Sequence, residues 1–276
     1  MRRNVMLITG ANGFLASKVV RQSYRDWQIV ALVRPETSIP SNFHVTYQSI
    51  NKLISDVAHV DVIMHFAACI PSSLDAAPAE LISVNVNLVA KLIQAYPNAR
   101  HVLASSVSVF GIPVSLPLSI DSPPHQPNAY GLSKLTAENL VCQTQHHAII
   151  RFSSLIGVGM KFGSFIPTVV SAARMGKIHL IGSGERLQNY LDIDDAASMC
   201  LQAANSEKSF IALGIGERSY SNNDVAQFLK ELTGASIVRT GEDHSPSYVY
   251  DFSESMNFGT QRISLKESLK IMVQQI

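Results

Sequence analysis

The chain has 276 residues, of which 46% are hydrophobic and only 16% charged, so it is not disordered and can bury a large core. Its net charge is +1 and it has no long basic or acidic run, which argues against nucleic acid or a membrane surface as a partner. Three scattered cysteines without metal-site spacing, and an N-terminal apolar run of only four residues, predict a cytoplasmic protein without a metal ion.

Short β-branched runs alternate with longer amphipathic stretches through the first half of the chain. The runs predict strands at residues 5–9, 28–34, 61–68, 101–106 and 147–154. The stretches predict helices at residues 14–25, 83–96 and 130–145. Alternation of this kind indicates an α/β protein with a doubly wound parallel sheet that helices cover on both faces.

Glycines become frequent after about residue 155, where the character of the sequence changes. Two further helices, at residues 164–176 and 224–234, each end at a glycine, as helices commonly do. Met175, in the first of them, is interpreted as a core residue. We predict that residues 156–276 form mainly a smaller α/β region, packed against a main domain of residues 1–155.

The stretch LITGANGFLA places Gly10 and Gly13 where the first strand ends and the first helix begins. In a dinucleotide-binding loop, the first glycine allows a tight turn and the second lets the backbone approach a pyrophosphate at the helix N-terminus. The main domain is therefore predicted to be a Rossmann domain that binds NAD(P), and the smaller region to bind the substrate. The loop contacts are assigned to Gly10, Asn12, Gly13, Phe14 and Leu15.

Arg34 stands near the end of the second predicted strand, where an NAD site usually carries an acidic residue. A carboxylate there would hold a ribose hydroxyl of NAD, whereas a guanidinium can pair with the additional phosphate of NADP. No acidic residue precedes Arg34 in the motif ALVRP. The sequence therefore predicts NADP as the cofactor, with NAD as the alternative.

The stretch NAYGLSK contains Tyr130 and Lys134, which lie about one helical turn apart and could share a face. An unperturbed tyrosine is protonated at neutral pH, and a neighbouring ammonium favours its ionised form. Alone, such a pair is more often a packed tyrosine beside a solvated lysine. With Ser106 and the glycine loop upstream, the pair indicates acid–base chemistry in which Ser106 fixes the reacting oxygen.

The motifs TGANGF, HFAA, ASSVSVFG and YGLSK occur in this order, and with them the chain resembles the extended short-chain dehydrogenase/reductases. More narrowly, it is similar to the NAD-dependent epimerase/dehydratase family, whose usual substrates are nucleotide-activated sugars. The resemblance continues through RFSSLIG, GSGERLQNYLDIDDAA and LGIGERSYSNNDVAQFL, and so covers nearly the whole chain.

The resemblance implies a catalytic role for three residues. Ser106 matches the serine that binds the substrate oxygen, and Tyr130 matches the tyrosine that serves as acid and base. Lys134 matches the lysine that holds the nicotinamide ribose and lowers the pKa of the tyrosine.

Other matches imply contacts around the cofactor. Ala67 and Ala68 would line it, and Phe152 would flank the nicotinamide. Asn85 falls where the family has a structural asparagine in a central helix. His65 is interpreted as a hydrogen-bonded histidine near the cofactor.

The segment that should hold a substrate phosphate departs from the family pattern. Its usual arginine is here Gln188, and Arg186 lies two residues earlier. On an extended strand both side chains would face the same side, so Arg186 could replace the missing arginine. Ser154 stands where an asparagine is usual. The predicted substrate-binding residues are Ser106, Ser154, Arg186 and Gln188.

These observations predict an NAD(P)-dependent oxidoreductase or epimerase that acts by hydride transfer on a sugar hydroxyl or keto group, preferentially of a nucleotide-activated sugar. The missing arginine leaves open a second enzyme hypothesis, NADPH-dependent reduction of a non-sugar carbonyl. A hypothesis of another class is a binding protein that senses NAD(P) without turnover, against which the intact Ser106, Tyr130 and Lys134 argue. The expected partner is a small-molecule substrate, and a homodimer is a possible assembly.

Overall fold

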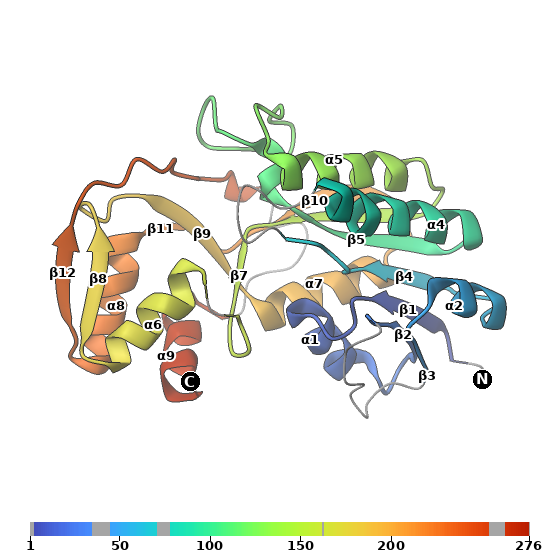
Figure 1. The fold of residues 1–276 in the computed structure, drawn as a ribbon, viewed down its shortest axis with the longest axis horizontal. Helices are drawn as coiled ribbons and strands as arrows, with labels where there is room; N and C mark the ends of the chain where they lie inside the picture. The colour runs from blue at the N-terminus through green and yellow to red at the C-terminus, as the bar shows by residue number, and fades with distance from the viewer. Residues whose placement is uncertain (1–2, 35–44, 71–77, 162, 254–262, 276) are drawn as a thin grey trace. The chain divides into compact units, whose positions relative to one another are not determined.

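The computed structural model describes residues 3–34, 45–70, 78–161, 163–253 and 263–275 (Figure 1). Its contacts divide the chain into two units. The first consists of residues 1–111, 123–152 and 197–213, and the second of residues 112–122, 153–196 and 214–276. The segments of the units therefore alternate along the chain, and residues 197–213 return to the first unit. A single domain boundary near residue 155 stays a prediction.

A seven-stranded sheet forms the centre of the first unit (Figure 1). Its strands are β1 (Val5–Thr9), β2 (Gln28–Leu32), β3 (Val45–Tyr47), β4 (Val62–His65), β5 (Arg100–Ser106), β6 (His147–Phe152) and β10 (Phe210–Gly214). They lie in the order β10-β6-β5-β4-β1-β2-β3. The pairings from β3 through β1 to β6 are parallel, which confirms the predicted Rossmann sheet.

Helices cover both faces of this sheet, which is why all five residues of β1 are buried. On one face, α2 (Ile50–Asp56) and α4 (Leu88–Ala95) pack against residues such as Leu7 and Ile63. Next to them, α5 (Ala129–Cys142) packs Ala137 and Val141 against β5 and β6. Figure 1 shows α1 (Phe14–Ser23) on the other face. The sequence missed β3 and α2, because both are short.

The helix predicted at residues 83–96 starts earlier in the structure and changes its type along its length. It begins with α3 (Pro78–Leu81), continues as a single π-helical segment, η1 (Ile82–Asn87), and ends as α4. The segment holds Asn85, whose buried carboxamide accepts a hydrogen bond from Cys69 N at 2.8 Å. It also donates to Cys69 O at 3.1 Å and to Ser133 Oγ at 2.9 Å. These bonds confirm the structural role expected for Asn85.

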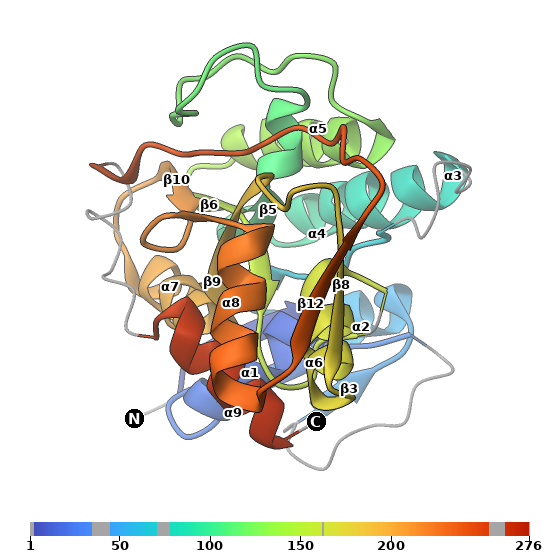
Figure 2. The same ribbon diagram turned by 90° about the vertical axis from the view of Figure 1, so that its left-hand side faces the viewer.

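The described residues of the second unit form two small sheets with helices packed on them (Figure 2). One sheet joins β7 (Ser154–Ile156), β9 (Leu187–Asp192) and β11 (Ser219–Ser221), and the other joins β8 (Lys177–Ile181) and β12 (Ser236–Thr240). The helices α6 (Phe165–Arg174), α8 (Asn222–Thr233) and α9 (Leu265–Gln275) share an apolar core with these strands. In Figure 2, α8 runs beside the pair of β8 and β12.

Capping residues fix where the helices of the second unit begin and end. Ser221 and Asp224 form a capping box, so α8 begins two residues before the predicted start. Gly234 ends α8 in the left-handed conformation with φ 76°, as predicted.

The interpretation of Met175 as a core residue is wrong: it follows the last residue of α6 and is 78% exposed. Among the described residues, no helix has the length and apolar character needed to cross a membrane.

Candidate cofactor and catalytic site

The loop after β1 has a geometry that only glycine fits. Gly10 has φ +64°, and a Cβ there would lie 2.8 Å from the Cα of Ala67. The Gly10 amide donates to Leu32 O at 2.9 Å, and the Gly13 amide donates to Gly10 O at 2.7 Å. Together these contacts set a tight turn between the ends of β1, β2 and β4.

The helix that follows this turn offers a place for an anion. Gly13 is the N-cap of α1, and no side chain caps the first turn, which also contains no acidic residue. Uncapped amides at a helix N-terminus attract phosphate, because their N–H groups and the helix dipole both favour negative charge. The residues present therefore fit the pyrophosphate of a dinucleotide.

Thr9 ties the loop to the neighbouring strand and was not singled out by the sequence. Its hydroxyl accepts hydrogen bonds from Phe66 N at 3.1 Å and from Ala67 N at 3.0 Å. It also donates to Met64 O, at 3.3 Å. The backbone of Ala67, one of the predicted cofactor-lining residues, is thus held against Gly10.

The remaining predicted cofactor residues lie at the carboxyl ends of the same parallel strands, the edge where such sheets bind ligands. Arg34 follows β2 and is exposed, and Ala68 follows β4 and is exposed. Phe152 ends β6 and pairs in register with Ser106, the last residue of β5. The first unit thus brings these residues to one edge, whereas their contacts to a cofactor stay a prediction.

Ser106 lies at a turn of the backbone between β5 and a short 3₁₀ helix, η2 (Val107–Phe110). Its hydroxyl accepts from Ser108 N at 3.1 Å and donates to Ser108 Oγ at 3.0 Å. The first turn of α5 packs closely on this helix, since a Cβ on Gly131 would lie 2.3 Å from Ser108 O. This close packing brings the residue before Gly131, Tyr130, to Ser106.

The Ser106 hydroxyl lies close enough to the Tyr130 hydroxyl to affect its pKa. Burial raises the pKa of Tyr130 to about 12, and the Ser106 hydroxyl partly opposes the rise. Burial lowers the pKa of Lys134 to about 8, against the attraction of Glu138, which raises it. That Lys134 lowers the pKa of Tyr130 stays a prediction.

A pair of buried histidines lies on β4 and β5, near the lysine. His65 Nε2 and His101 Nδ1 are 3.0 Å apart, and His101 Nε2 is 3.2 Å from Tyr96 O. Since a carbonyl oxygen only accepts, His101 carries its proton on Nε2, and its Nδ1 accepts from His65 Nε2. His65 Nδ1 is then a buried acceptor with no hydrogen-bond partner in the described part of the chain. The expectation of a fully hydrogen-bonded His65 is thus met at one nitrogen only.

Because of this histidine pair, we expect the folded protein to become less stable as the pH falls. Burial lowers the pKa of His101 from 6.5 to about 4, and burial, with His101 and Lys134 nearby, lowers the pKa of His65 as well. Both rings are neutral when folded, so the unfolded chain binds more protons below pH 6.5. We expect the free energy of unfolding to fall from pH 6.5 to about 4, by up to about 1.4 kcal/mol per pH unit for each ring.

Urea unfolding at a series of pH values checks this expectation. His101→Asn keeps an acceptor for His65 and should flatten the dependence, whereas His146→Asn, at an exposed histidine, should leave it unchanged. Equal slopes for the wild type and His101→Asn would contradict the assignment.

The other predicted substrate-binding residues belong to the second unit. Ser154 is exposed and pairs with Tyr190 between β7 and β9. Gln188 lies on β9 and donates from Nε2 to Asn222 Oδ1 at 3.0 Å. Arg186 precedes the strand and donates from Nε to Pro246 O at 3.2 Å. Gln188 is thus engaged within its own unit, and a substrate role for any of the three stays a prediction.

A parallel doubly wound sheet with a glycine loop at the end of its first strand defines a dinucleotide-binding protein of the Rossmann type. A model of the NAD dependent epimerase/dehydratase family matches residues 6–216. The chain therefore belongs to this family of enzymes.

Several known proteins with similar sequence or structure act on or bind nucleotide sugars, by their names. UDP-glucose 4-epimerase of Lactobacillus helveticus is 24% identical, over 85% of this chain and 83% of its own. The structure of MoeE5 in complex with UDP-glucuronic acid and NAD has a TM-score of 0.85 at 23% identity, covering 99% of this chain and 98% of the other. That of UDP-glucose 4-epimerase with UDP-glucose from Thermotoga maritima has a TM-score of 0.83 at 19% identity, covering 98% and 97%.

Proposed function

We propose that the protein is an NAD(P)-dependent epimerase that inverts a hydroxyl-bearing carbon of a nucleotide-activated sugar. The observation that carries the proposal is the close packing of the first turn of α5, with Tyr130, on the 3₁₀ helix that Ser106 caps, with Lys134 one turn along α5. The glycine loop and the family membership support it. Two of the proteins above are UDP-glucose 4-epimerases by name, which favours this substrate class over others. A cytoplasmic location and a homodimer are part of the same proposal.

Each of the three residues has one task in the proposed reaction. Tyr130 exchanges a proton with the sugar oxygen, and Ser106 hydrogen-bonds the same oxygen and fixes its position. Because burial raises the pKa of Tyr130 to about 12, the phenol is protonated at neutral pH and suited to donate. A dinucleotide held by the glycine loop would supply the hydride chemistry at the sugar carbon. Lys134 holds the nicotinamide ribose, and its positive charge favours removal of the phenolic proton in the reverse direction.

Cofactor choice depends on Arg34 in this account. The residue is exposed at the end of β2, and we propose that it pairs with the additional phosphate of NADP. MoeE5, whose structure holds NAD, shows that the fold also accepts that cofactor. We expect Arg34→Asp to weaken NADP binding by about 1.5–3 kcal/mol, the size of a hydrogen bond to a charged group, and NAD binding far less.

Fluorescence titrations with NADPH and NADH measure this difference. Arg25→Asp, at another exposed arginine that contacts Tyr24, is the charge-matched control and should change neither affinity. Equal losses for both cofactors in Arg34→Asp would show that Arg34 does not read the phosphate.

Arg186 tests the substrate class. If its guanidinium holds the diphosphate, Arg186→Ala should raise KM for a nucleotide sugar with little change in kcat, because the contact is equal in ground and transition states. In the wild type with cofactor bound, a nucleoside diphosphate at ~100 times its Kd should add about 2.7 kcal/mol of stability. Thermal unfolding with uridine, thymidine, cytidine and guanosine diphosphates measures the gain.

A second function is the reduction of a non-sugar carbonyl. Gln188 favours it for two reasons: its side chain carries no charge to offer a diphosphate, and it already donates a hydrogen bond to Asn222. In that case no nucleoside diphosphate would stabilise the protein, and Arg186→Ala would be silent. Lys161→Ala, at an exposed cation of the same unit, is the control for a general loss of positive charge.

A further inference from the structure

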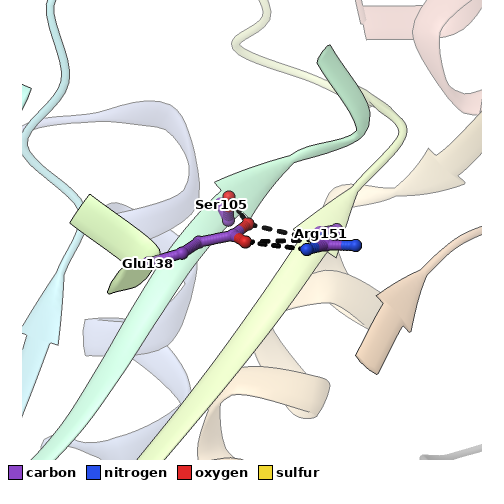
Figure 3. A network of polar contacts seen from close by, with 3 residues as sticks. All are labelled: Ser105, Glu138 and Arg151. Atoms are coloured by element: carbon purple, nitrogen blue, oxygen red, sulfur yellow. Dashed lines mark hydrogen bonds and ion pairs between the residues drawn. The ribbon is translucent and has the colours of Figure 1, made fainter. Parts of the chain in front are cut away.

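Glu138 lies on α5, one turn after Lys134 and two turns after Tyr130, and it is only 3% exposed. Its carboxylate accepts a hydrogen bond from Ser105 Oγ at 2.5 Å. It also accepts from Arg151, at 3.2 and 3.3 Å from Nε and 2.9 Å from Nη2. Figure 3 shows the three side chains meeting from α5, β5 and β6.

Both partners of Glu138 directly precede a residue of the candidate site. Ser105 comes before Ser106, and Arg151 comes before Phe152, which is the register partner of Ser106. The guanidinium of Arg151 also lies over the Phe110 ring, 5.0 Å from its centroid, which fixes it further. One carboxylate therefore joins the three elements that carry Ser106, Tyr130, Lys134 and Phe152, at the level of those residues.

Stability alone is a weak reason for such an arrangement. A buried ion pair can often be replaced by neutral side chains without loss, because burying two charges costs as much as their attraction returns. The position of Glu138 beside Lys134 gives it a second effect, since it raises the pKa of the lysine against the lowering by burial. Other titratable groups near the pair are His65 on β4 and Cys142 on α5.

We propose that Glu138 is a positioning residue of the active site: it holds Ser106 and Lys134 in register, and its negative charge keeps Lys134 protonated at the working pH. The proposal rests on the function proposed for Tyr130 and Lys134. Arg151 holds the carboxylate in place through its hydrogen bonds from Nε and Nη2. Without the carboxylate, burial acts on Lys134 unopposed, and the lysine loses its proton at a lower pH.

Two variants separate this role from a structural one. Glu138→Gln alone leaves the Arg151 guanidinium buried without its counter-ion and should lower the melting temperature. In Glu138→Gln/Arg151→Gln, two amides replace the ion pair, and the melting temperature should return toward that of the wild type. In the double variant, we expect both kcat and NADH affinity to decline at a pH about one unit lower than in the wild type, as in Glu138→Gln alone. Recovery of the wild-type pH profile along with stability would overturn the proposal.

Ser105→Ala keeps the ion pair between Glu138 and Arg151, and it tests the positioning role even if the double variant does not fold. It frees one side of the carboxylate beside Ser106, and we expect kcat to fall on the order of tenfold at unchanged NADH affinity. A wild-type kcat would overturn the positioning role. NADH affinity, followed by fluorescence, can be measured without a substrate. If the pH profile of binding is shifted but no nucleotide sugar is turned over, the proposed function is contradicted and the inference about Glu138 still stands.

Discussion

Replacing Tyr130 with phenylalanine is expected to reduce kcat by about 10²–10⁴-fold while cofactor affinity changes little, because the variant lacks only the hydroxyl that carries the proton. The ring remains, so the packing of the first turn of α5 against η2 is kept. The loss should appear in kcat and in kcat/KM alike, since the proton moves only in the transition state. Steady-state rates together with NADH titrations measure both quantities.

Tyr96→Phe is the matched control for this prediction. The Tyr96 hydroxyl is also in the first unit and donates to Val57 O at 2.9 Å, outside the candidate site. Its removal should cost about 1 kcal/mol of stability and leave kcat unchanged. Full activity in Tyr130→Phe would remove the proposed mechanism, and equal losses in both variants would point to a general loss of structure.

Gly10→Ala is expected to abolish detectable binding of NADH and NADPH, the second large effect. The left-handed backbone at φ +64° costs alanine about 1–2 kcal/mol, and the contact with the Cα of Ala67 adds overpacking of about 1–3 kcal/mol. The turn can relieve this contact only by moving away from Ala67, which shifts the amides at the start of α1. A change of position there disturbs the backbone that faces the pyrophosphate.

Gly176→Ala separates backbone strain from crowding. Gly176 has φ +85°, yet a Cβ there would meet nothing within 4 Å. This variant should lose a similar amount of stability from strain and keep full cofactor affinity. If Gly10→Ala binds NADH like the wild type, the proposal that the loop holds the dinucleotide is contradicted.

Local patterns made the first part of the fold predictable. The glycine loop needs a strand, a turn and a helix within a few residues, and all three are visible in LITGANGFLA. The helix that carries Tyr130 and Lys134 was also predicted, at residues 130–145, although its buried face includes Ser133, Lys134 and Glu138. Short elements such as β3 and α2 were missed, since a few residues give too little periodicity.

Long-range contacts made the rest unpredictable. Glu138 and Arg151 lie 13 residues apart on different elements, and nothing local marks them as an ion pair. Likewise, the bond between His65 and His101 joins residues 36 apart and depends on the pairing of β4 with β5. The influence of burial on Tyr130 could not be read from the sequence either, because NAYGLSK shows neighbours along the helix but not what covers it.

The most direct test of the proposed function is to incubate the purified protein with a catalytic amount of NAD or NADP and each of several nucleoside diphosphate sugars, and to follow the sugar by NMR. We expect that at least one of them converts to its epimer in large excess over the cofactor, with no lasting reduction of the cofactor, and that Tyr130→Phe converts none. The absence of any epimer while the cofactor is demonstrably bound, or the formation of one equivalent of reduced cofactor per molecule of product, would contradict it.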